Sequence, residues 1–153
     1  MATREELAAL RPGAAVRVEG DEYMVERTIR FEQADGYSWW EHRLSSDGTG
    51  SSRWLEVDPD GPVIVHHGSD TLGYEPEGAT EIEHRGKRFQ LLMSGQASYR
   101  SVERSAVPKS GELVYYEYAS GDRRVTYECR SESTVWEVSE GHMIDPATIE
   151  IVA

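Results

Sequence analysis

Two short aromatic segments, each ending in a glutamate, hold the side chains best suited to chemistry in this sequence. Residues 39–41 (Trp-Trp-Glu) match residues 115–117 (Tyr-Tyr-Glu). Paired carboxylates serve general acid–base and glycosidase catalysis when they lie a few ångströms apart and their environments separate their pKa values. Glu41 and Glu117 are therefore the candidate carboxylate pair. On exposed strands, however, such carboxylates are more often solvated or paired with a cross-strand arginine.

No catalytic or metal-binding motif accompanies this pair. The sequence has no Gly-x-Ser-x-Gly, phosphate loop or dinucleotide fingerprint, and no His-Glu-x-x-His. The adjacent His66 and His67 would point to opposite faces of a strand. The single cysteine, Cys129, excludes an internal disulfide and a cysteine-rich zinc site. We therefore expect no catalytic residue, no metal and no cofactor.

Compared with catalysis, a recognition surface is the favoured function of the two segments. Neighbouring strand residues point to opposite faces, so Trp39 and Trp40 cannot share one core. We expect Trp40, His42 and Leu44 to face inward, which places Trp39 on the outer face with its alternate neighbours. An exposed tryptophan beside tyrosine and charged groups is typical of a binding hot spot. The predicted binding residues are Tyr37, Trp39, Glu41, Tyr115 and Glu117.

Packing is the competing interpretation of the same residues. Trp39 could cover the second half of the chain or the N-terminal helix. The aromatic residues of the two segments could line one groove, or they could form the joint between two halves. Under the binding hypothesis, Trp39→Ala leaves the fold intact and costs about 2 kcal/mol or more of binding. A collapse of thermal stability would instead identify Trp39 as a core residue.

Period-two alternation of apolar and polar residues predicts that nearly the whole chain is β-strand. The pattern is clearest at 22–31, where Tyr23, Val25, Ile29 and Phe31 share one parity and Arg27 is an exception. A capping-box pattern beginning at Thr3 predicts one short N-terminal helix. We expect an all-β fold, either a sandwich or a small barrel. The predicted strands are 15–18, 22–31, 37–44, 53–57, 63–66, 81–84, 89–94, 97–107, 113–119, 123–130, 134–139 and 148–152.

The sequence also contains an internal repeat. Residues 16–25 align without gaps on 82–91, and the motif Leu-Glu-Val at 55–57 matches Trp-Glu-Val at 136–138. Three matches in the same order predict two antiparallel β-meander halves within a single domain, 1–153. Chance similarity among short alternating strands is the alternative. The predicted halves are 11–67 and 80–152, and the predicted linker is 68–79.

The composition narrows the class of partner. The chain of 153 residues carries a net charge of −12 and has a sequence pI of about 4.8. This balance disfavours nucleic acid and anionic membrane surfaces, both of which need a basic patch. No apolar run approaches the roughly 20 residues that span a bilayer, and the acidic N-terminus is unlike a signal peptide. We expect a cytoplasmic protein that does not insert into membranes.

A pattern of glycines and aromatic residues resembles the uncharacterised bacterial domain family DUF4178. The closing half of the family is similar to Gly111-Glu112-Leu113 and the strands after it, but tyrosines stand at 115 and 116 where the family pattern has Pro-Trp. The resemblance covers roughly residues 10–152. The residues that carry its opening part are Leu10, Pro12, Gly13, Val16, Gly20, Tyr23, Val25, Trp40, Glu41, Leu44, Trp54 and Leu55.

The resemblance implies a bacterial cytoplasmic protein and supplies no activity, cofactor or catalytic residue. It also implies genes that lie near those of small membrane proteins, which extends the candidate partners to membrane-associated proteins. We expect a non-catalytic interaction or regulatory module that binds a protein partner. The alternatives are a small-molecule-binding protein or an enzyme with its site between the halves, and a homodimer joined by the aromatic residues. An enclosed pocket with convergent polar groups would favour a small molecule.

Overall fold

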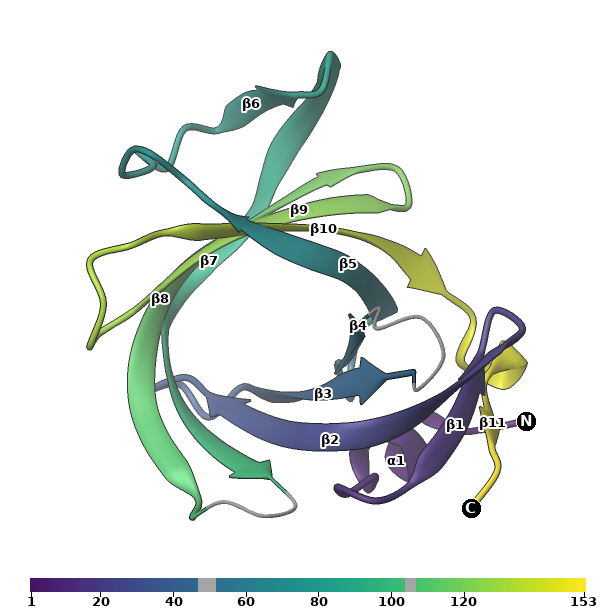
Figure 1. Cartoon of the computed structure of the whole chain (residues 1–153). Coiled ribbons are helices and arrows are strands. Elements are labelled where there is room, and N and C mark those ends of the chain that lie inside the picture. Colours follow the sequence, from purple (N-terminus) through teal and green to yellow (C-terminus); the bar gives the residue numbers. More distant parts are fainter. Residues whose placement is uncertain (47–51, 104–106) are drawn as a thin grey trace.

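A computed structural model of the chain describes residues 1–46, 52–103 and 107–153. Eight antiparallel strands close into a barrel in the order β2-β3-β4-β5-β10-β9-β8-β7, because β2 also pairs with β7 (Figure 1). The predicted all-β fold is confirmed. The barrel strands are β2 (Asp21–Glu32), β3 (Ser38–Ser45), β4 (Ser52–Val57), β5 (Val63–Thr71), β7 (Lys87–Glu103), β8 (Lys109–Ser120), β9 (Arg123–Arg130) and β10 (Glu137–Ile144).

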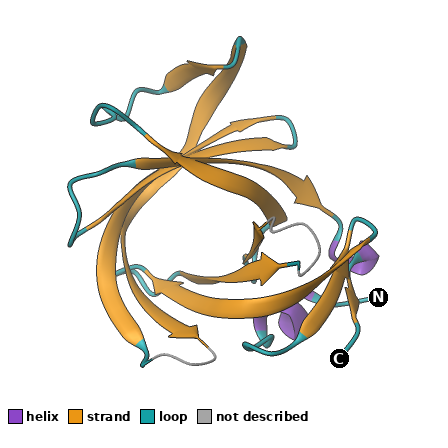
Figure 2. Ribbon diagram, in the orientation of Figure 1, coloured by secondary structure: helices purple, strands orange, loops and turns teal. Residues whose placement is uncertain are grey.

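The remaining elements lie outside the barrel (Figure 2). They are α1 (Arg4–Ala8), β1 (Ala15–Val18), β6 (Glu81–His84), a 3-10 helix (Pro146–Thr148) and β11 (Glu150–Ile151). The predicted capping box is present: Thr3 accepts a hydrogen bond from the Glu6 backbone, and the Glu6 side chain accepts one from the Thr3 backbone. No helix in the described part of the chain is long and apolar enough to cross a membrane.

Each half of the chain contributes four consecutive strands to the barrel. The strands β2–β5 come from the first half and β7–β10 from the second, and the seams are the β2–β7 and β5–β10 pairs. The preceding hairpins use the aligned turns Glu19-Gly20 and Arg85-Gly86, which all have positive φ. Such two-residue turns match the right-handed twist of paired strands. The duplication itself stays a prediction.

Two parts of the barrel's outer face are apolar and covered, and they form part of the hydrophobic core. Leu44, Leu55 and Val63 of β3–β5 pack in one cluster with Leu7 of α1 and Val16 of β1. A second outer cluster joins β8 and β9 to segments outside the barrel; it contains Phe89, Tyr118, Val125, Tyr127 and Trp136. Because the added segments cover apolar strand faces, the inner faces are free to carry polar side chains.

A β-bulge between Val25 and Arg27 corrects the prediction that β2 buries one face along its length. Tyr23 and Val25 pack in the outer cluster beneath α1. Beyond the bulge, Ile29 and Phe31 of the same parity belong to a cluster inside the barrel. The extra residue reverses the side to which one parity points. The exception at Arg27 was therefore the sequence signal of the switch.

Several predicted strand boundaries were wrong. The predicted strands 89–94 and 97–107 are one continuous strand, β7, in the described chain up to Glu103, and residues 104–106 lie outside the described residues. The strand predicted at 134–139 is β10, which starts at Glu137 and runs to Ile144. The strand predicted at 148–152 shortens to Glu150–Ile151, since a 3-10 turn ends at Thr148.

Candidate functional site: the barrel interior

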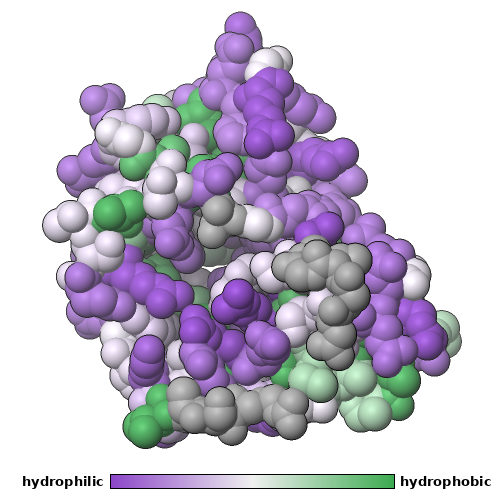
Figure 3. Space-filling model, viewed as in Figure 1, coloured by the Kyte–Doolittle hydropathy of each residue, from purple (hydrophilic) through white to green (hydrophobic). Residues whose placement is uncertain are grey.

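The barrel interior holds two adjoining compartments, each partly open to solvent. The first, which we call the acidic compartment, is a cavity of about 270 Å³ lined by side chains that include Tyr37, Trp39 and Tyr115. The second, the arginine compartment, has about 380 Å³. The face drawn in Figure 3 is mostly hydrophilic around a central hollow. The two compartments share the residues Phe31, Glu41, Glu56, Thr126 and Glu128.

Aromatic rings form one wall of the acidic compartment. Trp39 stacks on Phe31 with ring centroids 5.1 Å apart, and the ring of Tyr115 meets it edge-on at 5.5 Å. Tyr37 lies tilted against Trp39 at 5.7 Å and donates a hydrogen bond to Asp58. The Tyr115 hydroxyl donates to Gln33 Oε1 at 2.6 Å. These contacts hold the rings in fixed orientations, so the wall is rigid and preformed.

Four glutamates project into the same interior as this wall. Glu41 and Glu56 are cross-strand neighbours on β3 and β4, while Glu117 and Glu128 come from β8 and β9. All four are partly buried and line the cavity, so protein atoms replace part of the water that would solvate a charge. Placing several carboxyl groups in such a space disfavours ionisation of each one.

The pKa values of these carboxyl groups reflect this confinement. Burial, followed by repulsion from the Glu56 and Glu128 carboxylates, raises the pKa of Glu41 to about 8. Burial, followed by repulsion from Glu128, raises the pKa of Glu56 to about 7. Burial and Glu56 raise the pKa of Glu117 to about 7, and burial raises that of Glu128. The interior therefore holds carboxyl groups that change charge near neutral pH.

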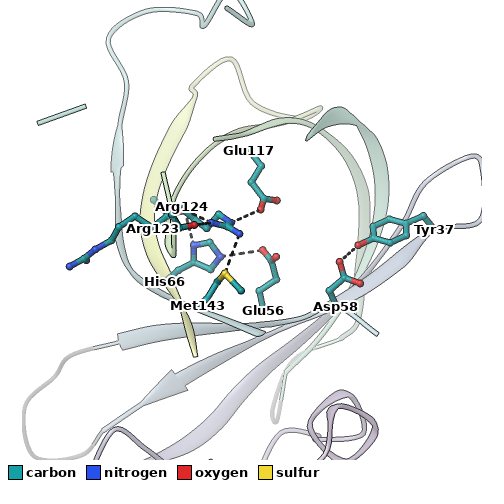
Figure 4. Close-up of polar contacts among 10 residues, drawn as sticks. Tyr37, Glu56, Asp58, His66, Glu117, Arg123, Arg124 and Met143 are labelled. Atoms are coloured by element: carbon teal, nitrogen blue, oxygen red, sulfur yellow. Dashed lines mark hydrogen bonds and ion pairs between the residues drawn. The ribbon is translucent and has the colours of Figure 1, made fainter. Parts of the chain in front are cut away.

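A basic group lowers the pKa of each of the four glutamates, and in the described structure two of them form close ion pairs. Figure 4 shows Glu56, His66, Glu117 and Arg124 pointing toward one another inside the barrel. Glu56 Oε1 lies 3.2 Å from His66 Nε2, and Glu117 Oε1 lies 3.5 Å from Arg124 Nε. Arg130 lowers the pKa of Glu128 against the effect of burial. His66 lowers the pKa of Glu41 from a greater distance, and the hydrogen bond to Glu41 comes from the neutral indole Nε1 of Trp39 at 3.1 Å.

Several buried polar atoms in the interior have no hydrogen-bond partner among the described residues. They are Arg27 Nε, Arg124 Nε and Thr126 Oγ1. All three residues line the compartments. Arg124 Nε is within ion-pair distance of Glu117, yet their geometry is not that of a hydrogen bond. Buried polar atoms are nearly always satisfied in folded proteins, so these atoms mark a place for polar contacts.

The structure brings all five predicted binding residues into the acidic compartment. Tyr37, Trp39, Glu41, Tyr115 and Glu117 line the same cavity. The prediction that Trp39 is exposed on an outer surface was wrong, because its side chain is only 8% exposed and faces the interior. The predicted separation of faces was correct: Leu44 and His42 lie on the opposite side, under α1. The binding role of the five predicted residues stays a prediction.

Sequence reasoning missed Glu56, Asp58, His66, Arg124 and Glu128 as members of this site. In β9, Arg124 and Glu128 lie on the polar face of the strand, which alternation ordinarily leaves to solvent. It faces the barrel interior instead, because the apolar face packs under outer segments. The available signal was the presence of a glutamate on the polar face of several strands. Only the strand order shows that these glutamates face the same interior as Glu41.

The site has the means for binding and for proton exchange. Among the described residues, no group of three or more histidine, cysteine, aspartate or glutamate side chains is arranged to hold a metal ion. His42 is a structural residue: its Nδ1 is 3.0 Å from Thr28 Oγ1, its Nε2 is 2.8 Å from the Leu7 carbonyl, and burial lowers its pKa to about 4. The site can provide a ligand with aromatic contacts and with ionisable carboxyl groups.

The fold and interior define a class of protein: a closed eight-stranded antiparallel barrel with an internal cavity of aromatic and ionisable side chains. The chain belongs to the domain of unknown function family DUF4178, whose model matches residues 11–146. It is 28% identical over 144 residues to the uncharacterised proteins Rv2597 of Mycobacterium tuberculosis and Mb2628 of Mycobacterium bovis, covering 88% of this chain and 68% of each relative. No solved structure matches the chain.

Proposed function

We propose that this protein binds a small molecule inside its barrel. The observation that carries the proposal is the acidic compartment inside the barrel, where aromatic rings and partly unsatisfied polar groups converge on about 270 Å³ of space. Ligand sites are typically concave, largely preformed and mostly apolar with a few polar groups that fix orientation. The volume is slightly below the usual range for drug-sized ligands, so it suits a compact molecule.

The energetic cost of the interior supports a functional origin. A barrel of this size is filled by side chains or holds one small ligand. Apolar side chains would fill the space without the desolvation that raises the pKa values of Glu41, Glu56 and Glu117. Retaining buried carboxyl groups at the expense of stability is common at binding and active sites.

A protein partner is less well supported than at first expected. That hypothesis relied on Trp39 and Tyr115 as exposed platforms, and both are buried, with 8% and 4% of their surface exposed. A cytoplasmic location remains part of the proposal, as does the absence of membrane insertion. A homodimer would have to use surfaces other than these two rings.

The proposal can be tested with ligand-observed NMR against a fragment library, using the full chain. Thr126 lines both compartments, so Thr126→Phe should fill the cavity, whereas Thr134→Phe places the same ring on an exposed loop. Circular dichroism would first establish that both variants fold. We expect fragments to bind the wild type and Thr134→Phe but not Thr126→Phe. Absence of any bound fragment, or equal binding to Thr126→Phe, would contradict the proposal.

A further inference from the structure

Building on the proposed function, we infer that the acidic compartment takes a small organic ammonium ion with an apolar body and a hydrogen-bond-accepting oxygen. The compartment is lined by Glu41, Glu56, Asp58, Glu117 and Glu128, and by a single guanidinium group, that of Arg124. The inference names the chemical class of ligand and depends on three separate features of this cavity: its unpaired carboxyl group, its aromatic wall and its unsatisfied donors.

Glu41 is the position for the ammonium group. Among the described residues, no basic side chain comes within 4.0 Å of the Glu41 or Glu128 carboxylate, whereas Glu56 and Glu117 have His66 and Arg124. Of the first two, Glu41 is the one that is hydrogen-bonded to Trp39 of the aromatic wall. Its neighbours Glu56 and Glu128 add further negative potential, which raises the pKa of Glu41 beyond the effect of burial. A cation placed here would relieve that repulsion and form a charge-assisted hydrogen bond in a confined space.

The apolar body of the ligand fits the aromatic wall. Phe31, Trp39 and Tyr115 are held together by ring contacts at centroid distances of 5.1 and 5.5 Å, next to the Glu41 carboxylate. Aromatic rings attract cations through the negative charge on their faces and bury apolar groups with little loss of entropy. A carboxylate beside aromatic rings is therefore complementary to an amine on an apolar frame.

The accepting oxygen follows from the unsatisfied donors. Arg124 has a side chain that is 8% exposed, and its Nε lacks a hydrogen-bond partner in the described structure. Thr126 Oγ1 is also buried and without a partner, and both residues line the acidic compartment. A ligand hydroxyl or carbonyl oxygen can accept a hydrogen bond from either group. A plain alkylamine has no accepting oxygen and would leave the N–H of Arg124 Nε unsatisfied, at a cost in affinity.

The arginine compartment does not lead to the same assignment. Its lining includes Arg27, Arg43 and Arg130 together with Glu41, Glu56, Glu128 and Glu137, so charges of both signs are present. Arg27 pairs with Glu103, and Arg130 lies 5.2 Å over the ring of Tyr99. An anionic ligand at these arginines is the competing outcome of the experiment.

The test compares four probes that share a phenyl ring: 2-amino-1-phenylethanol, phenethylamine, 2-phenylethanol and phenylacetate. Isothermal titration calorimetry at pH 7.5 would measure the affinity of each for the wild type, Glu41→Gln and the control Glu26→Gln, whose glutamate is exposed on β2. We expect the amino alcohol to bind best. Loss of the amine should weaken binding by about tenfold or more, and loss of the hydroxyl by about fivefold.

Glu41→Gln should weaken both amines by about tenfold or more and leave 2-phenylethanol unaffected, whereas Glu26→Gln should change nothing. Titrations in buffers of different ionisation enthalpy should show protons released on amine binding, since a cation favours the ionised carboxylates. Tighter binding of phenylacetate, or unchanged amine affinity in Glu41→Gln, overturns the inference. If neutral or anionic fragments bind in the cavity and the amines do not, the inference fails while the proposed function stands.

Discussion

Replacing Glu41 with glutamine should stabilise the protein at alkaline pH. The pKa of Glu41 rises from 4.5 to about 8 on folding, chiefly because of burial. The unfolded chain therefore loses this proton at lower pH than the folded chain does. The contribution of the group to stability is fully present below pH 4.5 and declines as pH rises toward 8. Each pH unit in this window costs about 1.4 kcal/mol for one proton.

At pH 8 the accumulated cost of Glu41 is of order 4 kcal/mol, an upper value because Glu56 and Glu128 share the same field. Glutamine keeps an acceptor for the Trp39 indole and carries no charge. Urea unfolding at pH 5 and pH 8 would measure the difference. We expect Glu41→Gln to match the wild type near pH 5 and to exceed it by a few kcal/mol at pH 8.

The exposed Glu26→Gln is the control for this experiment, and it should leave the pH dependence unchanged. If Glu41→Gln has the same pH dependence as the wild type, Glu41 is solvated and the reasoning about the interior fails. A stabilising effect combined with lost amine binding would separate the two roles of this residue. Substitution of a residue with a purely structural role would not raise the stability of the protein while lowering its affinity for the ligand.

Three further predictions concern packing. Trp39→Ala should cost about 3–5 kcal/mol in urea unfolding, because it empties a buried aromatic cluster; a loss below 1 kcal/mol would restore the exposed hot-spot hypothesis. Thr28→Val should cost about 1–3 kcal/mol by leaving buried His42 Nδ1 without its partner, and unchanged stability would refute that hydrogen bond. Gly78→Ala should lower the melting temperature, since φ is +71° and a Cβ would lie 2.8 Å from a tyrosine ring, whereas Gly73→Ala meets no atom within 4 Å; equal melting temperatures would contradict this.

The sequence predicted the strands well where one face is apolar and the other polar. The predicted bounds 15–18, 81–84 and 123–130 coincide with β1, β6 and β9. Alternation also separated the side chains of Trp39 and Trp40 correctly. It could not tell which face would be the interior of the barrel, because both faces of these strands are covered. That information lies in the closure of the sheet, which is non-local.

The sequence predicted the aromatic residues of the candidate site but not most of its ionisable residues. Tyr37, Trp39 and Tyr115 attracted attention because exposed aromatic residues are unusual. Glu56 and Glu128 drew none, since a glutamate on the polar face of a strand is ordinary. Only the order β3-β4-β5-β10-β9-β8 places these carboxyl groups around one space. Their raised pKa values arise from that proximity and from burial.

The two seams of the barrel have a consequence for how the chain folds. Arg27 on β2 pairs with Glu103 on β7, 76 residues later. The other seam likewise cannot form until β10 has been synthesised and can pair with β5. At a synthesis rate of about 5–20 residues per second, the first half exposes two unpaired strand edges for several seconds. Such non-local pairing is slow and open to wrong association until it is complete. Until the second half pairs with the first, the Glu41 and Glu56 side chains are in contact with water. The free-energy cost of desolvating them therefore arises in the last folding step, when the second half closes the barrel.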